Sequence, residues 1–107
     1  MTTKSKKTYI IYACSFNTGN TIYHEMADTK DNAIMRGIDL SRKNSNNFYY
    51  LIYENIQFVA YTDSLFEENK MLVPIKKATK STLIAECRIG SILYYDYEKE
   101  IVWFFGY

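Results

Sequence analysis

The sequence has few of the residues from which active sites and metal centres are built. It contains one His, two Cys, four Gly and one Pro, and it has no Gly-rich phosphate loop and no zinc-ligand spacing. No apolar run approaches the ~20 residues that a membrane-spanning helix requires, and the apolar stretch at residues 9–14 is too short for a secretory signal. We therefore expect a cytoplasmic protein that is not an enzyme and uses no metal, cofactor or membrane.

A strong charge of either sign is also missing. Thirteen basic and twelve acidic residues give a net charge of +1, which argues against a polycation that coats nucleic acid and against a polyanion that imitates it. The length of 107 residues suits one domain. We expect residues 1–6 to form a flexible basic tail and residues 7–107 to form a single α+β domain.

Aromatic residues are plentiful. They make up 17% of the chain, as eleven Tyr, six Phe and one Trp. Lys, Asn and Ile are also abundant, and the codons of these residues, like those of Tyr and Phe, are rich in A and T. The sequence therefore indicates an AT-rich genome, such as that of a low-GC bacterium, its phages or its mobile elements.

The first strand signals surround a turn at residues 17–20. Residues 9–16 and 21–27 are β-prone, and a three-residue loop between them would place Cys14 opposite His24. One face of this hairpin is almost entirely apolar, so we expect it to face the core. That face carries Ile10, Tyr12, Cys14, Phe16, Ile22, His24 and Met26.

The next segment has the pattern of a helix from about Thr29 to Lys43. Asp28 is a suitable N-cap, and Asp31 places a second carboxylate in the first turn. Gly37 costs about 1 kcal/mol against Ala inside a helix, so it indicates close packing on a sheet. The predicted packing stripe consists of Ile34, Gly37, Ile38 and Ser41.

Two further hairpins complete the pattern. Residues 48–62 form one if the chain turns at Glu54-Asn55, and residues 91–107 form another around Glu98-Lys99. Between them the pattern favours a short helix or turn near residues 76–80 and a strand over residues 82–89, while Pro74 argues against a central strand.

These elements predict an α+β fold with a single domain. We expect an antiparallel sheet of about five to seven strands, built from three hairpins, with one main helix over residues 29–43 packed on one face.

Two ideas about chemistry depend on the cysteines. A Cys14 thiol within reach of the His24 imidazole could act as a nucleophile, but the pair points toward the predicted core and lacks an orienting residue, so a packed pair is favoured. Both cysteines are expected to be reduced and buried, because a bridge between Cys14 and Cys87 requires neighbouring strands. The alternating acids Asp96, Glu98 and Glu100 indicate a solvated turn and not a cation site.

Protein binding fits the composition best, because Tyr and Trp are common interface anchors. The acidic final hairpin would be steered toward a larger protein with a basic surface, whereas Trp103 is expected in the core. The predicted partner-binding residues are Tyr94, Tyr95, Asp96, Tyr97, Glu98 and Glu100, and the second candidate surface holds Tyr50, Glu54 and Tyr61.

As a small chain with AT-rich codons and excess aromatics, the protein resembles the accessory proteins of phages and mobile elements, including anti-CRISPR-type inhibitors. The resemblance implies an inhibitor that occupies the surface of a host nucleic-acid-handling protein in a bacterial cytoplasm. A small single-stranded nucleic-acid-binding module is the alternative, because exposed aromatics can stack on bases and local lysines could contact phosphates, although seven acidic residues accompany the aromatic hairpins. A homodimeric structural protein is the third interpretation.

Overall fold

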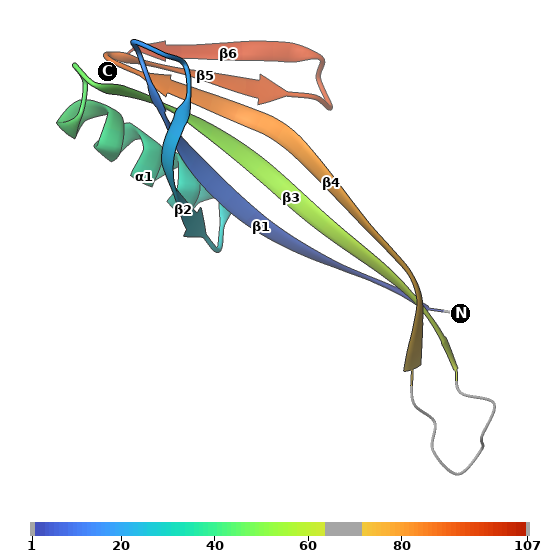
Figure 1. Cartoon of the computed structure of the whole chain (residues 1–107). Coiled ribbons are helices and arrows are strands. Elements are labelled where there is room, and N and C mark those ends of the chain that lie inside the picture. Colours follow the sequence, from blue (N-terminus) through green and yellow to red (C-terminus); the bar gives the residue numbers. More distant parts are fainter. Residues whose placement is uncertain (1, 64–71, 107) are drawn as a thin grey trace.

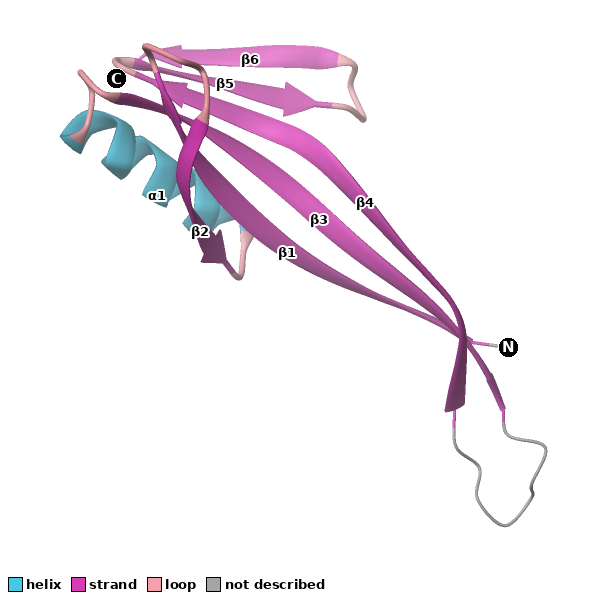
Figure 2. Cartoon of the chain, viewed as in Figure 1, coloured by secondary structure: helices cyan, strands magenta, loops and turns pink. Residues whose placement is uncertain are grey.

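The computed structural model describes residues 2–63 and 72–106, with side chains for residues 4–59 and 78–106. Among the described residues, one helix lies against a sheet of strands (Figure 2). The elements in chain order are β1 (Thr2–Ser15), β2 (Thr21–Ala27), α1 (Lys30–Lys43), β3 (Phe48–Asp63), β4 (Leu72–Arg88), β5 (Ser91–Asp96) and β6 (Ile101–Gly106).

The six strands form one antiparallel sheet in the order β2-β1-β3-β4-β5-β6. Helix α1 packs mainly against β1, β2, β3 and β4 and lies on one face (Figure 1). The predicted α+β class, with a single domain and one helix on an antiparallel sheet, is confirmed.

The predicted second hairpin is wrong, because β3 is one continuous strand. Glu54 lies opposite Tyr9 of β1 and Thr82 of β4, and Asn55 lies between neighbours on both sides in the same way. The two polar residues have the pattern of a turn, but their backbone groups pair with β1 on one side and β4 on the other, so the chain stays extended. Asn55 contributes to this pairing, since its Oδ1 accepts a hydrogen bond from Ser81 Oγ at 2.6 Å.

Strand β4 replaces the short helix or turn that was predicted near residues 76–80. The predicted strand at 82–89 is present and extends back to Leu72. Pro74 pairs with Tyr61 of β3, while β5 pairs with β4 only over Ala85–Arg88. The outer side of β4 is therefore an edge at Pro74, where a missing N–H is tolerated.

Residues 2–6, predicted as a flexible tail, belong to β1. Thr2 lies opposite Tyr61, and Lys6 lies opposite Gln57. The segment gave no signal of a partner strand, but the far half of β3 offers it a free edge. Residues 2–8, 54–63 and 72–82 of β1, β3 and β4 form a three-stranded projection beyond α1, here called the arm (Figure 1).

The N-cap of helix α1 lies one residue later than predicted, at Thr29. The Oγ1 of Thr29, rather than the carboxylate of Asp28, accepts the N–H of Asn32 at 3.1 Å. The helix ends where the N–H of Asn44 donates to the carbonyl of Leu40. The helix limits differ from the prediction by a single residue at the start.

The core lies between α1 and the sheet. Gly37 is buried in the middle of the helix face, and a Cβ built there would lie 2.9 Å from Ile52 Cδ1 and 3.0 Å from Cys87 Sγ. The predicted close approach at Gly37 is confirmed. The core cluster comprises Tyr9, Ile11, Ala13, Ala33, Leu40, Tyr50, Ile52, Ile84, Ala85, Cys87 and Ile92, with Ile34 and Ile38 packed against it.

The predicted core face of the first hairpin is the wrong face. Ile11 and Ala13 of β1 pack beneath the helix, whereas Phe16, Ile22 and Met26 are 40%, 56% and 58% exposed. Both faces of β1 are apolar in sequence, so alternation alone could not distinguish them. The small Ala13 lets the helix approach closely, and this favours the face that it occupies.

Candidate protein interface

The terminal hairpin is the predicted one. Its register runs from Asp96 opposite Ile101 to Ser91 opposite Gly106, which centres the turn on Glu98 and Lys99. β6 is the last strand in the sheet order. Among the described residues its outer edge therefore has no partner strand.

Strand β6 exposes a large apolar side chain at each of its first five positions. Phe104 is 67% exposed, and Trp103, which was predicted to lie in the core, is 42% exposed. The prediction failed because none of the described elements covers either face of β6. Edge strands are commonly protected by Lys, Pro or a bulge, yet residues 101–106 contain no charge and no Pro. The exposed residues are Ile101, Val102, Trp103, Phe104 and Phe105.

The turn between the strands has a defined conformation. Asp96 Oδ1 accepts the N–H of Lys99 at 3.1 Å, and Glu100 adopts a φ of 55°. The Lys99 ammonium lies 5.9 Å from the ring centroid of Trp103. Glu98 and Glu100 are exposed, so the hairpin presents two carboxylates beside its apolar edge.

The three predicted tyrosines do not share one environment. Tyr95 and Tyr97 stack with ring centroids 6.4 Å apart. Tyr97, 59% exposed, donates its hydroxyl to the carbonyl of Leu83 at 2.6 Å. Burial raises the pKa of Tyr95, and the neighbouring Glu86 raises it further. Tyr94 points to the helix side.

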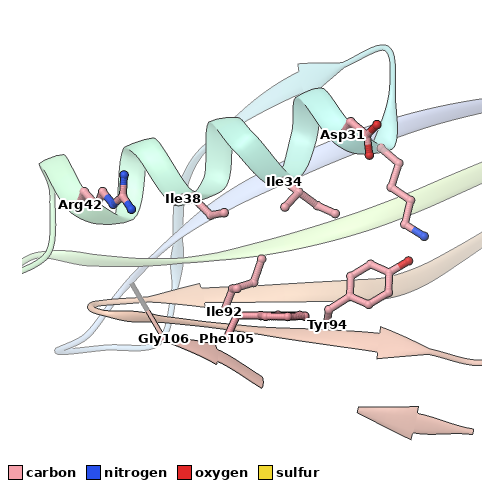
Figure 3. A pocket seen from close by; sticks show the side chains of 9 residues that line it. Asp31, Ile34, Ile38, Arg42, Ile92, Tyr94, Phe105 and Gly106 are labelled. Carbon is pink, nitrogen blue, oxygen red and sulfur yellow. The ribbon is translucent and has the colours of Figure 1, made fainter. Parts of the chain in front are cut away.

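A groove separates this hairpin from α1. On one side of the groove lie Ile34 and Ile38 of the helix, and on the other lie Ile92, Tyr94 and Phe105 of the hairpin (Figure 3). The volume of the groove is about 450 Å³. The groove exists because α1 lies over the strands before β5. Its rim is charged, with the Lys30 ammonium 4.4 Å from the ring centroid of Tyr94, and with Asp31 and Arg42.

Tyr50, predicted to belong to the second candidate surface, lies in the core instead. This side chain is fully buried, and its hydroxyl lies 2.9 Å from that of Tyr23 and accepts from Asn44 Nδ2 at 3.0 Å. Burial, above all, raises the pKa of Tyr50. Glu54 is partly buried and accepts the Tyr9 hydroxyl at 3.0 Å, and the side chain of Tyr61 lies outside the described part.

The proposed Cys14–His24 pair does not form. His24 lies opposite Tyr12, and Cys14 follows a register shift and lies opposite Thr21. The thiol of Cys14 is buried, 3.9 Å from Thr21 Oγ1. Cys14 and Cys87 are free thiols on β1 and β4, with β3 between them, so the condition for a bridge is not met.

Searches against protein-family models, curated proteins and solved structures found no match. Helix α1 is neither long nor apolar enough to cross a membrane. Within residues 2–63 and 72–106, no group of His, Cys, Asp and Glu side chains is arranged to hold a metal ion. The terminal hairpin is therefore the feature of the described chain that best supports a proposal of function.

The sequence pattern located this hairpin but not the exposure of both faces of β6 or the groove. The signal for that exposure was present in Ile101–Phe105, where both faces of one strand are apolar. The groove could not be foreseen, because it depends on which strands α1 covers.

Proposed function

We propose that this protein is a non-enzymatic protein-binding module and that the hairpin β5–β6 is its interface. The supporting observation is the apolar, unpaired edge of β6, whose side chains are 41–67% exposed from Ile101 to Phe105. A strand edge of this kind can accept an extended segment of another protein through main-chain hydrogen bonds, while side chains on the two faces provide specificity.

The chemistry of the hairpin indicates the kind of partner. Trp103 is a suitable aromatic anchor, and such anchors are commonly worth about 2 kcal/mol or more in an interface. The exposed carboxylates of Glu98 and Glu100 lie at one end of the apolar edge and favour association with a basic surface. Nucleic-acid-handling proteins present such surfaces, so our proposal is an inhibitor of a host protein of that class, as anti-CRISPR-type proteins of phages and mobile elements are.

The test compares how much of one bacterial host protein is retained by three tagged proteins. They are the wild type, Phe104→Lys and Met35→Lys. Phe104 and Met35 are 67% and 69% exposed, and Met35 lies on α1, so the two variants add the same charge at equally exposed apolar positions. We expect the retained protein to be lost with Phe104→Lys and kept with Met35→Lys. Equal retention by both variants would refute the hairpin as the interface.

A second pair of variants tests the aromatic contact. Tyr97→Ala is expected to weaken binding of the identified partner at least about tenfold, while Tyr97→Phe removes only the hydroxyl bonded to Leu83 and keeps the ring. Raising the salt concentration should slow association. Wild-type affinity in Tyr97→Ala, together with a salt-independent association rate, would contradict the proposed contact.

A further inference from the structure

The sheet face opposite α1 forms a second surface, distinct from the edge of β6. The described residues place no helix over it (Figure 1), and we call it the open face. Strand alternation and the register place its side chains in rows across the sheet. Along β1 and β3 they are Lys4, Lys6, Thr8, Ile10, Tyr12, Cys14, Tyr49, Leu51, Tyr53, Asn55, Gln57 and Val59.

Aromatic rings lie on the half of the open face away from the arm, here called the body of the sheet. Tyr12 and Tyr53 meet edge to face with centroids 5.5 Å apart, and His24 lies 6.0 Å from Tyr12. Phe16 and Tyr49 form a second pair at 5.3 Å. A hollow of about 280 Å³ lies beside Tyr12 and Tyr53. Partly exposed rings on a flat sheet are the usual platform for unpaired bases.

The open face of the arm is polar and basic. Lys6 lies in a row with Gln57 and Thr79, and the next row toward the body holds Asn55 and Ser81. Ser81 also lines the hollow beside Tyr12 and Tyr53, so the two halves are continuous. Lysine, amide and hydroxyl side chains are the groups that most often contact phosphates.

Three of the four acidic side chains described on the strands lie away from this surface. Glu25 pairs with Arg36 of α1 at 2.8 Å, and Glu54 and Asp96 lie on the helix side, where both line a hollow with Lys30. Among the described side chains of the strands, Glu86 is the acidic one on the open face. Of the acids that counted against nucleic acid in the sequence, Glu54 and Asp96 therefore lie on the face opposite the aromatic rings of Tyr12 and Tyr53.

We propose that the open face binds single-stranded nucleic acid, with bases against the rings of Tyr12 and Tyr53 and backbone phosphates at Lys4 and Lys6. The arm extends the path of the nucleic acid away from the body. At the opposite end Arg88, 4.3 Å from the ring centroid of Tyr49, adds a cation. A duplex would keep its bases stacked on one another and could not reach the rings.

The test measures fluorescence anisotropy of a labelled oligothymidylate of about 20 nucleotides. Lys4→Glu/Lys6→Glu reverses charge on the open face, and Lys7→Glu/Lys80→Glu makes the same net change on the other face of the same arm. All four lysines are exposed, so both variants should fold. We expect the open-face variant to lose at least about tenfold in affinity while its control keeps most of it.

Salt dependence and the rings complete the test. Two phosphate contacts predict a slope of about −1.4 for the logarithm of affinity against that of salt. Tyr53→Leu should weaken binding, and Tyr53→Phe should not. The proposal is overturned if the oligonucleotide does not bind at low salt, if both charge variants lose affinity equally, or if a duplex binds as tightly.

Discussion

Replacement of Gly37 by Ala tests the packing on which the fold depends. An Ala Cβ would lie 2.9 Å from Ile52 Cδ1 and 3.0 Å from Cys87 Sγ. Both of these side chains are fully buried, so neither can move into solvent. Overpacking of this kind costs about 1–3 kcal/mol, whereas the change to Ala adds about 1 kcal/mol of helix propensity. We expect a net loss of about 1 kcal/mol in the free energy of unfolding.

The two contributions can be separated by urea denaturation of matched variants. Met35 is 69% exposed on the same helix, so the difference between Met35→Ala and Met35→Gly measures helix propensity without a packing contribution. Ile52→Val removes the Cδ1 atom that an Ala at position 37 would meet. Alone, Ile52→Val should cost about 0.5–1.5 kcal/mol, and in the Gly37→Ala background it should cost about 1 kcal/mol less.

Two outcomes would refute this reasoning. The first is stabilisation by Gly37→Ala equal to the Ala–Gly difference measured at position 35. The second is an additive double-mutant cycle between Gly37→Ala and Ile52→Val, which would mean that the two positions are not in steric conflict.

Four further predictions test other parts of the structure by urea denaturation. Phe16→Ala should cost less than about 1 kcal/mol, because the ring is 40% exposed. Tyr50→Phe should cost about 1–3 kcal/mol, because it removes the buried hydroxyl that is hydrogen-bonded to the partly buried Tyr23 and Asn44. Thr29→Ala should cost about 1 kcal/mol, and Asp28→Ala should be within about 0.5 kcal/mol of wild type, if Thr29 is the N-cap. Burial raises the pKa of the Cys87 thiol to about 12, and an unfolded thiol titrates near about 8.5. Its contribution to stability is therefore complete below about pH 8.5 and is lost as the pH rises toward 12, and Cys87→Ala should remove this part of the pH dependence.

Local signals were sufficient for the helix and the last hairpin. Asp31 and Gly37 report a helix start and a packing face within a few residues of one another, although the cap was predicted at Asp28 and lies at Thr29. Glu98 and Lys99 separate two β-prone runs that pair with each other. In both cases the interacting residues are close in sequence, so the pattern contains the information needed.

The incorrect predictions concern features that depend on pairing between segments far apart in the sequence. Glu54 and Asn55 look like a turn until β1 and β4 flank them, and Lys6 looks like part of a tail until Gln57 lies opposite it. Tyr50 looks like an interface residue because aromatic side chains alternate on both faces of β3. Its burial depends on the position of α1, which is set by contacts between distant segments.

The excess of aromatic residues follows from the ratio of helix to sheet. A helix is about 10 Å wide and strands lie about 4.8 Å apart, so one helix cannot cover all six described strands. Because α1 packs against β1, β2, β3 and β4, the strand β6 and the whole face opposite α1 stay uncovered within the described residues. Tyrosine suits such surfaces because its apolar ring carries a polar hydroxyl, and the hydroxyl of Tyr97 donates to the carbonyl of Leu83. The uncovered strand β6 carries Trp103 and Phe104. The ring of Trp has one N–H donor, and the ring of Phe has no polar group. Within the described residues nothing covers these two side chains, and this is the physical reason for proposing β6 as the interface.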